Sequence, residues 1–455
     1  FIPEAARAGA VASLVEEATG AKDIIEIVVG DSRAALGLVG HEFYGRPSEK
    51  LRTHAITGTN GKTTTSYLLD SVLRESGLKT GVVGTLGYRV GDRLVEGSMT
   101  SPESLDLARL LGSMVDEGVR AVTMEISSHA LTLKRTAGAL FDTATFTNLS
   151  RDHLDFHGTI AEYAAAKKLL FGQIAGAGGK EGATAIINTD DEFGRELAAY
   201  VGSTGNLRLV TYGRSGADVS VVDASSGPAG TTATFTTPAG DLTTELKLIS
   251  EFNVMNALAA TAIAVSQGVP VDIVASGLSK VGSVDGRLET VDAGQDFAIV
   301  IDYAHTPDAL KKTLTTVARL VPGRLITVFG CGGDRDKGKR PMMGEIAAAG
   351  SDVVVVTSDN PRTEDPAEII AQIVEGAKPA PAGAEIEVIE DRRAAIAHAI
   401  GMAVPGDLVL IAGKGHEDYQ IVGNTKLHFD DREEARAAVV AGGSDRGNDG
   451  EGTAD

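Results

Sequence analysis

The stretch that decides the fold covers residues 53–64 and reads THAITGTNGKTT. Its first five residues, THAIT, carry no charged side chain and predict a buried strand, and the residues from Lys62 onward predict a helix. Backbone N–H groups in a glycine-rich turn between a strand and a helix can hold phosphate oxygens, while a lysine there reaches the terminal phosphates. A hydroxyl next to that lysine can bind Mg²⁺. The stretch therefore predicts a nucleotide site, with a tight turn and an exposed lysine as the alternative.

The predicted nucleotide site consists of consecutive residues. These are Gly58, Thr59, Asn60, Gly61, Lys62, Thr63 and Thr64. The stretch departs from the general pattern GxxxxGK[ST], because Ile56 stands five positions before Gly61 where the pattern has its first glycine. A plain pattern search would miss it, so the prediction depends on the strand and helix on either side.

Short apolar runs alternate with helical patterns on the C-terminal side of this stretch. The runs TGVVGTL, RAVTMEIS and DTATFTN predict strands, and helices are predicted after Pro102 and around Tyr163–Phe171. Such alternation is typical of βαβ units, whose helices cover both faces of a parallel sheet. Between Leu207 and Leu248, three runs separated by Gly, Pro and Ser turns predict antiparallel strands on the rim of that sheet.

A second α/β unit is predicted near the middle of the chain. Two predicted helices, Ser250–Gln267 and Asp272–Lys280, lead to a boundary near Gly282–Gly286. Beyond it the runs FAIVIDYA, GRLITVFG, DVVVVTSD and GDLVLIAG predict strands of another sheet, with helices between them. The fold class is therefore α/β, with a doubly wound, mostly parallel central sheet that has an antiparallel rim and a second, Rossmann-like domain.

Three segments are delimited by these patterns. We expect a central domain at residues 48–283, a C-terminal domain at 284–440 and a tail at 441–455. The tail is Gly-rich and acidic and has nothing to bury, which predicts disorder. The opening segment, FIPEAARAGAVASLVEE, predicts a helix inside a domain.

Charge and composition limit the possible partners. The chain has 455 residues, 43% of them hydrophobic, and a net charge of −20, which disfavours nucleic acid because its phosphates require Lys and Arg. The only cysteine, Cys331, rules out an internal disulfide and is expected to be a small buried residue. No run approaches the roughly 18 apolar residues of a membrane span, and no charged and then apolar leader opens the chain. We expect a cytoplasmic monomer with no membrane span.

Three further polar groups follow predicted strands or helices. Glu125, in MEISSHAL, ends a strand beside the phosphate loop, where a carboxylate can hold Mg²⁺; a surface carboxylate is the alternative. The segment FTNLSRDHLDFHG contains two histidines, including His153, together with two aspartates and an arginine, and this density favours a site. Lys167, in YAAAKK, indicates by itself only a solvated lysine on a helix.

The chain resembles a known family at these points. The motifs GTNGKTT, MEISSHAL, FTNLSRDHLDFHG, YAAAKKLLF and FNVMNALAA occur in this order and are similar to the central domain of the Mur ligases. In the C-terminal half, GRLETV, IDYAHTPDAL, VFGCGGDRDKGKRPMMG, TSDNPR and AGKGHEDYQ resemble the branch of that family that adds diaminopimelate. The resemblance covers most of residues 40–440.

The resemblance implies an ATP-dependent ligase of peptidoglycan synthesis. In this family ATP phosphorylates a substrate carboxylate, the incoming amine attacks the acyl phosphate, and amide, ADP and phosphate are released. The implied partners are UDP-N-acetylmuramoyl-L-alanyl-D-glutamate and meso-diaminopimelate. Such an enzyme must align two polyanions and offset their repulsion.

The resemblance also implies roles for individual residues. Catalysis is expected at Lys62, Glu125, His153 and Lys167. Mg²⁺ ions are expected at Thr63 with Glu125 and at His153, and Lys167 is expected to be carbamylated, which turns a cation into a metal-binding anion. The ATP site is expected to include also Asn253, Asn256, Arg287, Asp302 and His305. The UDP-linked peptide is expected at Thr100, Ser101, Ser127 and Arg135.

Specificity for the incoming amino acid is expected at the DNPR motif. Diaminopimelate carries a carboxylate and an ammonium at its far end, whereas lysine carries only the ammonium. Arg362 can bind that carboxylate through two parallel hydrogen bonds, so lysine would leave its charge unpaired. The contacts implied for this pocket are Arg335, Asp359, Asn360, Arg362, Gly413 and Glu417, of which Glu417 suits an ammonium group. Without the resemblance, DNPR would indicate a turn stiffened by proline.

One departure and several alternatives accompany this hypothesis. Family members start with a smaller domain that binds uridine diphosphate, and residues 1–47 are expected to be only its last part, so either the chain is cut or that substrate binds more weakly. A lysine-adding ligase is opposed by Arg362. An ATPase or kinase with another acceptor leaves DNPR and GKGHED unexplained, as does a folylpolyglutamate synthetase. A nucleotide-binding protein without activity is opposed by the presence of all four expected catalytic residues, Lys62, Glu125, His153 and Lys167.

Overall fold

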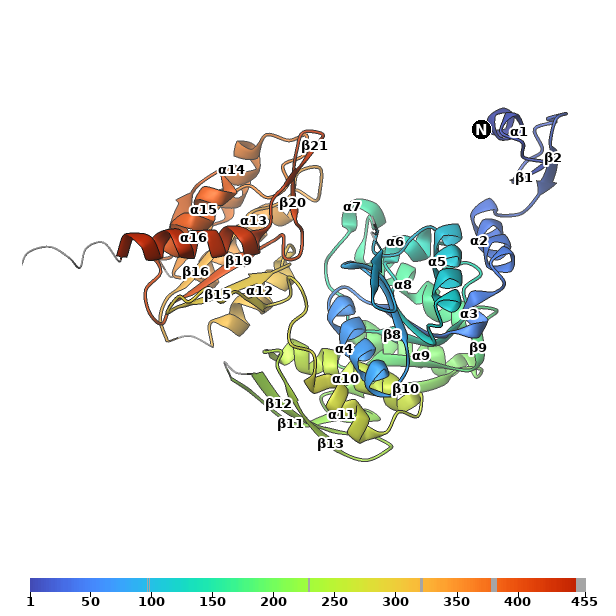
Figure 1. Ribbon diagram of the computed structural model, residues 1–455, viewed down its shortest axis with the longest axis horizontal. Coiled ribbons are helices and arrows are strands. Elements are labelled where there is room, and N and C mark those ends of the chain that lie inside the picture. Colours follow the sequence, from blue (N-terminus) through green and yellow to red (C-terminus); the bar gives the residue numbers. More distant parts are fainter. Residues whose placement is uncertain (96, 98, 228–229, 320–321, 378–382, 447–455) are drawn as a thin grey trace, which may run out of the picture.

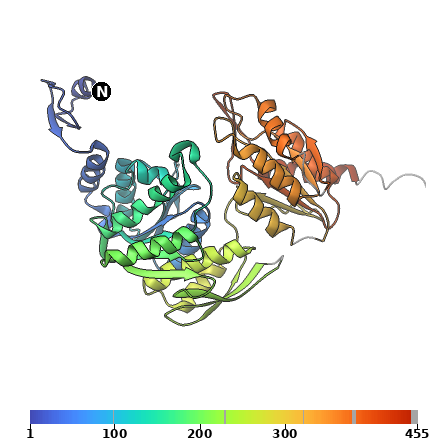
Figure 2. The same ribbon diagram turned by 180° about the vertical axis from the view of Figure 1, so that it is seen from behind.

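The computed structural model describes residues 1–95, 97, 99–227, 230–319, 322–377 and 383–446. Within these ranges the chain forms two large α/β units and a small N-terminal unit that lies away from them at one end of the molecule (Figure 1). The view from behind shows the same separation (Figure 2). The α/β class expected from the sequence is confirmed.

Strand β3 (Arg52–Thr57) contains the run THAIT quoted first and lies between β7 (Ala121–Glu125) and β8 (Phe141–Phe146). It is buried from its second residue to its last, as expected for a strand covered on both faces. Counted over the described residues, its sheet has 11 strands. From one edge to the other they are β13 (Leu242–Leu246), β12 (Gly230–Thr236), β11 (Val219–Gly227), β10 (Arg208–Gly213), β9 (Gly179–Asn188), β8, β3, β7, β4 (Thr80–Gly84), β5 (Gly87–Val90) and β6 (Arg93–Val95).

The strands from β11 to β4 are parallel, and both edges of the sheet are antiparallel. Strands β11, β12 and β13 form the rim predicted between Leu207 and Leu248, although β11 pairs in parallel with β10. The second rim, formed by β5 and β6 beside β4, was not predicted. Strand β6 has three residues and none of them is buried, so it offers no alternation of apolar and polar residues to detect.

Neighbouring side chains of β3 point into separate cores on the two faces of the sheet. Ala55 belongs to one core and Ile56 to the other. The core of Ala55 is covered by α5 (Ser104–Asp116), α8 (Ile160–Ala175) and α9 (Glu192–Thr204). The core of Ile56 is covered by α4 (Lys62–Glu75), α10 (Glu251–Ser266) and α11 (Val271–Ser279). The helix that starts at Lys62 is therefore packed along most of its length.

The second α/β unit contains the other predicted sheet. Its strands, in spatial order, are β14 (Glu289–Thr290), β15 (Ala298–Asp302), β19 (Leu408–Ala412), β16 (Leu325–Phe329), β17 (Val353–Val356) and β18 (Glu385–Val388). All pair in parallel except β14. One face is covered by α12 (Pro307–Val317), α13 (Lys339–Gly350) and α14 (Pro366–Ala377), and the other by α15 (Arg392–Met402) and α16 (Asp431–Arg446). The prediction of a second doubly wound sheet is correct.

Helix α16 is attached to this unit by a buried ion pair. Both oxygens of Asp431 accept from Arg392, at 2.8 and 2.7 Å, and neither side chain is exposed to solvent. The same guanidinium donates to the carbonyl of Ala412 at the end of β19. Helix α16 continues to Arg446, into the stretch 441–455 expected to be a tail, because lengthening a formed helix needs no new nucleus. The remaining residues of that stretch, 447–455, lie outside the described ranges.

The N-terminal unit corrects one expectation. Its elements are α1 (Ile2–Arg7), β1 (Ala12–Val15) and β2 (Ile25–Val28). The next helices, α2 (Ser32–Phe43) and α3 (Pro47–Lys50), pack against α5 of the central unit. The prediction of a helix throughout FIPEAARAGAVASLVEE is wrong beyond Arg7, because Gly9 has a φ of +92° and ends the helix. The chain then forms β1, parallel to β2. Helix α1 has no buried residue, so it does not lie inside a domain core.

Short elements complete the fold near the ends of the parallel strands. They are α6 (Ser128–Thr132), α7 (Leu154–His157) and the hairpin of β20 (Tyr419–Val422) and β21 (Thr425–His428). No strand of one large sheet pairs with the other within the described residues. On that basis we propose that residues 48–283 and 284–440 are separate domains. None of the helices described is both long and apolar enough to cross a membrane.

Helix α4 is so close to α11 that Gly277 leaves no space for a side chain. A Cβ atom at Gly277 would lie 2.5 Å from the Cα of Val72 on α4. We expect Gly277→Ala to destabilise the fold by about 1–3 kcal/mol, because helix backbone would have to move. Thermal unfolding measures the change. Gly202→Ala on α9, where a Cβ meets nothing within 4 Å, is the control and should be neutral or slightly stabilising. Equal effects of the two substitutions would contradict the expectation.

Candidate active site

The turn between β3 and α4 has a backbone that requires glycine at two positions. Gly58 has a φ of +148° and Gly61 a φ of +86°. A Cβ atom at Gly58 would lie 1.8 Å from Thr147 Oγ1, and one at Gly61 would lie 2.3 Å from Asn256 Oδ1. The two glycines therefore serve both the unusual backbone conformation and the close approach of neighbouring elements.

The end of β8 holds this turn in place. Thr147 Oγ1 and Asn148 Nδ2 donate to the carbonyl oxygen of Asn60, at 2.7 and 3.0 Å. In return the backbone N–H of Asn60 donates to Asn148 Oδ1 at 3.0 Å, and the N–H of Thr59 donates to the carbonyl of Asn148 at 2.8 Å. The shape of this turn, which we call the phosphate turn after the ligand expected from its sequence, is thus held by contacts within the protein.

Lys62 bends back over the turn. Its ammonium group donates to the carbonyl oxygens of Gly58 and Thr59, at 2.9 and 2.8 Å. Burial lowers the pKa of Lys62, while the negative charge of Glu125 opposes that shift. The arrangement places a cation with a spare N–H at the mouth of the turn, where the terminal phosphates of a nucleotide would lie.

Glu125 is fully buried at the end of β7 and is surrounded by hydroxyl donors. Thr63 Oγ1 donates to its Oε2 at 2.9 Å, and Thr85 donates through both its N–H and its hydroxyl, at 2.9 and 3.1 Å. A Cβ at Gly84 would lie 2.2 Å from Glu125 Oε1, so the strand beside it must lack a side chain there. The carboxylate is fixed next to the hydroxyl of the phosphate turn.

These two groups fit one Mg²⁺ ion, because that ion is usually bound by one or two carboxylates, water and substrate phosphates. In the part of the chain that the structure describes, no three His, Cys, Asp or Glu side chains gather in a way that could hold a metal ion without such partners. A metal at Thr63 and Glu125 would therefore depend on nucleotide oxygens. This fits a site that takes up metal together with its nucleotide.

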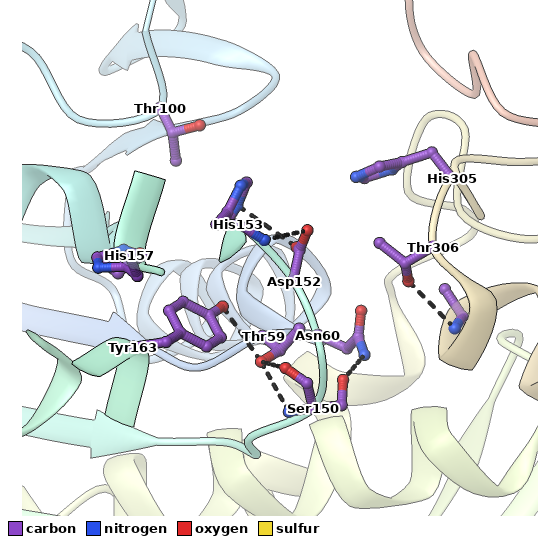
Figure 3. A network of polar contacts seen from close by, with 12 residues as sticks. Thr59, Asn60, Thr100, Ser150, Asp152, His153, His157, Tyr163, His305 and Thr306 are labelled. Atoms are coloured by element: carbon purple, nitrogen blue, oxygen red, sulfur yellow. Dashed lines mark hydrogen bonds and ion pairs between the residues drawn. The ribbon is translucent and has the colours of Figure 1, made fainter. Parts of the chain in front are cut away.

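Figure 3 shows the polar residues beside the turn. The imidazole of His153 lies 3.4 Å from Asp152 Oδ2, and its backbone has a φ of +52°, which only a few non-glycine residues adopt. Partial burial lowers the pKa of His153 to about 4 against the opposing charge of Asp152. Its ring is therefore neutral near pH 7 and has a nitrogen lone pair available.

Lys167 lies on α8 next to the same residues and is only 1% exposed. Its ammonium is 4.2 Å from the ring centre of Tyr163, whose hydroxyl lies 3.2 Å from Thr59 Oγ1 in the phosphate turn. Burial, reinforced by the charge of Lys62, holds the pKa of Lys167 well below its usual range. This is not the solvated lysine that its sequence context alone indicates.

The four residues expected at the UDP-linked peptide form one network around Glu125. Ser101 Oγ donates to the carbonyl of Glu125 and accepts from the N–H of Ser127, at 2.8 and 3.1 Å. The Thr100 hydroxyl lies 3.2 Å from that of Thr85. Arg135 donates to the carbonyl of Ser101 at 3.3 Å, with Nε on Glu103 at 2.8 Å. One edge of the Arg135 guanidinium is therefore already paired with the Glu103 carboxylate.

A cavity of about 780 Å³ opens beside the phosphate turn between the two large units. Of the residues expected at the nucleotide, its walls contain Asn60, Gly61, Thr64, Asn256, Arg287 and Asp302. Asn253 and His305 are not among the wall residues. Asn253 Oδ1 accepts from Asn256 Nδ2 at 3.0 Å, so it orients its neighbour, and His305 is held through Nδ1 against the carbonyl of Tyr303 at 2.8 Å.

The phosphate turn also touches the second unit directly. Asn60 Nδ2 donates to Asp308 Oδ2 on α12 at 3.1 Å, and Arg287 Nη2 approaches Thr63 Oγ1 at 3.4 Å. Asp302 does not point freely into the cavity, because its two oxygens accept from Leu288 N and Thr313 Oγ1, at 2.8 and 2.9 Å. Sequence reasoning missed Asp308, since a lone aspartate in the first turn of a helix usually serves the helix itself.

The DNPR turn, where the diaminopimelate pocket is expected, follows the end of β17. Arg362 has a φ of +51°, and this backbone is held by β20 and the turn after it, through Arg362 N to the carbonyl of Ile421 and Gly423 N to the carbonyl of Arg362. Its Nη1 donates to the carbonyl of Gly333 at 2.8 Å. Arg335 lies on the same loop as Gly333 and is exposed, with one hydrogen bond to the carbonyl of Asp334.

The other residues expected in this pocket surround a lysine that sequence reasoning missed. Lys414 contacts Asp359 and Asn360, while Asn360 Nδ2 donates to Glu417 Oε2 at 2.8 Å. Gly413 has a φ of +114° and donates its N–H to the carbonyl of Asp302. Burial and the charge of Asp359 raise the pKa of Glu417 to about 6. The missed signal was a lysine between two glycines directly after an apolar strand.

Comparison with known families agrees with this geometry. Residues 56–264 match the family model of the Mur ligase middle domain, and residues 286–415 match that of the Mur ligase glutamate ligase domain. The chain belongs to the Mur ligase family, whose members join an acid to an amine.

Named relatives have sequences of similar extent. The chain is 45% identical over 441 residues to a UDP-N-acetylmuramoyl-L-alanyl-D-glutamate–2,6-diaminopimelate ligase of Geobacillus kaustophilus, a match that covers 96% of this chain and 89% of the relative. A solved structure with the same enzyme name is 36% identical, with a TM-score of 0.68, and the match covers 96% and 88% of the two chains. A folylpolyglutamate synthase of Mycobacterium tuberculosis complexed with ADP is similar in fold alone, at 18% identity, a TM-score of 0.71 and coverage of 91% and 95%.

His416, in the loop after β19, is expected to make the stability of the folded chain depend on pH. Its ring lies 4.9 Å from that of Tyr303, and burial together with the charge of Arg287 lowers the pKa of His416 to about 3. The unfolded chain binds a proton here below pH 6.5 and the folded chain does not, so acid favours unfolding between pH 6.5 and 3. As the pH falls, the free energy of unfolding is expected to decrease less steeply in His416→Phe than in the unsubstituted chain. The difference in slope is up to about 1.4 kcal/mol per pH unit.

Thermal unfolding of both chains at a series of pH values between 7 and 4 checks this expectation. His428→Phe is the matched control, because His428 is exposed and its contact with Glu433 raises its pKa. Its removal should leave the acid slope unchanged or make it steeper. An acid slope of His416→Phe that equals that of the unsubstituted chain would refute the expected role of burial.

Proposed function

We propose that the chain is an ATP-dependent ligase that adds meso-diaminopimelate to UDP-N-acetylmuramoyl-L-alanyl-D-glutamate through an acyl phosphate. The observation that carries the proposal is the direct contact between the two units, where Asn60 and Thr63 of the phosphate turn meet Asp308 and Arg287. A phosphate site on one sheet and an amino-acid pocket on the other can then serve a single reaction. The names of the relatives, at up to 45% identity, support the same assignment.

ATP is proposed to bind with its phosphates on the turn and its base in the cavity beside Asn256. Lys62 and Arg287 would supply positive charge on two sides of the transferred phosphoryl group, where negative charge develops. Mg²⁺, held by Thr63 and Glu125, would offset the charge of the ATP phosphates. A second Mg²⁺ at His153 remains an inference from family resemblance, supported by the neutral state of its ring.

Lys167 is proposed to carry a carbamate formed from CO₂. Only an uncharged amine can react in this way, and burial, which lowers the pKa of Lys167, favours the uncharged form. Its position between Lys62 and the ring of Tyr163 would give the resulting anion a cation close by. The carbamate supplies a metal-binding anion at a position where the chain itself has a cation.

The two substrates are proposed to meet at the end of β7. The network of Thr100, Ser101, Ser127 and Arg135 would bind the UDP-linked peptide and present its carboxylate to the phosphoryl group. The DNPR pocket would hold the far end of diaminopimelate, with Arg362 on the carboxylate and Glu417 on the ammonium. Because the reaction consumes ATP, we place it in the cytoplasm. The expectation of a monomer stays a prediction.

The phosphate turn offers a test of nucleotide binding. Gly61→Ala would place a Cβ against Asn256, so we expect the affinity for ADP to fall at least tenfold, an effect of about 1.4 kcal/mol or more. Gly77 lies at the other end of α4 with a φ of +85°, close to the +86° of Gly61, but a Cβ there meets nothing within 4 Å. Gly77→Ala thus introduces the same backbone strain without the clash and should keep its ADP affinity. Titration with a fluorescent ADP measures both, and a similar loss in the two variants would exclude the clash as the cause.

The amino-acid pocket is tested through phosphate release with ATP, Mg²⁺ and the UDP-linked dipeptide. We expect release to require meso-diaminopimelate and to be much slower with lysine, which leaves Arg362 without its carboxylate. Arg362→Ala should raise the KM for diaminopimelate by about 100-fold, because a desolvated charge pair loses one partner. Arg393→Ala removes a surface arginine of the same unit that pairs with Glu434, and it should have no effect. Equal release with either amine, or with none, would overturn the proposed function and leave an ATPase.

A further inference from the structure

The side chain of Lys414 is completely buried, and three oxygen atoms lie within 3.2 Å of its ammonium group. Its Nζ donates to Asn360 Oδ1 at 3.0 Å and to the carbonyl of Tyr419 at 2.7 Å, and it lies 3.2 Å from Asp359 Oδ1. These acceptors come from the DNPR turn and from β20. With no exposed surface and these three neighbours, this lysine is not placed to bind a substrate.

Lys414 fixes the orientation of the Asn360 amide. The Asn360 oxygen accepts from Lys414 and also from the N–H of Ile421, at 3.0 and 2.9 Å. Its amide nitrogen must therefore point the other way, where it donates to Glu417 Oε2 at 2.8 Å. The contact fixes one oxygen of the Glu417 carboxylate, which also lies 3.9 Å from the Lys414 ammonium.

The same lysine ties together the segments that form the pocket. Asp359 and Asn360 precede Arg362 in the turn. The N–H and the carbonyl of Arg362 are held by Ile421 of β20 and by Gly423 directly after it. Gln420 Nε2 adds a hydrogen bond to the carbonyl of Asp359 at 2.8 Å. A displacement of the Lys414 ammonium would therefore affect the acceptor for the ammonium group and the arginine for the carboxylate together.

We propose that Lys414 is a positioning residue that sets specificity for an amino acid with both an ammonium and a carboxylate at its far end. It acts through Asn360, which holds Glu417 ready to accept the ammonium group, and through the turn that presents Arg362. The inference rests on the proposed function, because it assigns a role within the same pocket.

The charges around Glu417 give this role a specific signature. Burial and the charge of Asp359 disfavour its ionised form, whereas Lys414, Asn360, Arg362 and Arg392 favour it. With Lys414 present, the pKa of Glu417 is about 6. Loss of Lys414 removes a favourable charge and raises this pKa, so Glu417 would be protonated at a higher pH and would bind an ammonium group less well.

The test compares Lys414→Met with the unsubstituted chain. The dissociation constant of meso-diaminopimelate is measured by calorimetry with ADP and Mg²⁺ present, from pH 5.5 to 8.5, and KM values are measured alongside. We expect the dissociation constant at pH 7.5 to rise at least tenfold, and the pH below which binding weakens to move up by about one unit. The KM for ATP should stay within about twofold, because no hydrogen bond or ion pair described for Lys414 reaches a residue of the nucleotide cavity.

Lys426→Met is the matched control. Lys426 lies 4.1 Å from the ring of Tyr419 on the same hairpin but has no contact with Asn360 or Glu417 among those described. It should leave diaminopimelate binding and its pH profile unchanged. An equal effect of Lys426→Met would show that the hairpin as a whole, and not the hydrogen bonds of Lys414, controls the pocket, and the inference would fail.

Asn360→Asp is the second variant, which decides the matter if Lys414→Met does not fold. An aspartate keeps the contact with Lys414 but places a second carboxylate 2.8 Å from Glu417, so the pH profile should again move upward. A profile that does not move in any folded variant, or equal changes in the KM of ATP and of diaminopimelate, would overturn the inference. The unsubstituted chain alone decides the proposed function, through amine-dependent phosphate release, so the two failures are distinguishable.

Discussion

The close packing around the turn between β3 and α4 is the constraint on which the rest of the structure depends. Thr147, which directly follows β8, and Asn256 from α10 occupy the space that side chains at Gly58 and Gly61 would need. This packing fixes the direction of the backbone N–H groups and the start of α4 before any ligand arrives. The positions of Lys62, of the contact between Thr63 and Glu125, and of the partners in the second unit all follow from it.

Most of the fold could be predicted from the sequence, because buried parallel strands are continuous apolar runs. Strands such as β17 and β19 and the helix α4 lie where their patterns predict. The failures occurred where burial does not shape the pattern. The rim strand β6 has no buried residue, and the opening helix α1 ends at Gly9 without burying any side chain. Exposed elements lack the regular spacing of apolar residues from which strands and helices are predicted.

The candidate site was predicted unevenly for a related reason. The phosphate turn is local in sequence, so its spacing was sufficient, and the burial of Lys167 became apparent only when α8 was packed against Tyr163. The role of Lys414 depends on contacts with a turn more than fifty residues earlier and with the following strand. Contacts between distant segments cannot be predicted from patterns of neighbouring residues. Asp308, which contacts Asn60 of the other unit, was not predicted for the same reason.

The buried pair of Arg392 and Asp431 has a consequence for how the chain is made. Asp431 follows all six strands of the second sheet in the sequence. Arg392 begins α15 and donates to the carbonyl of Ala412, at the end of one of these strands. A nascent chain that lacks α16 would have to bury a guanidinium without its carboxylate, which costs several kcal/mol. The second unit therefore completes its core only after α16 has been synthesised, so the first unit can fold while its partner is still incomplete.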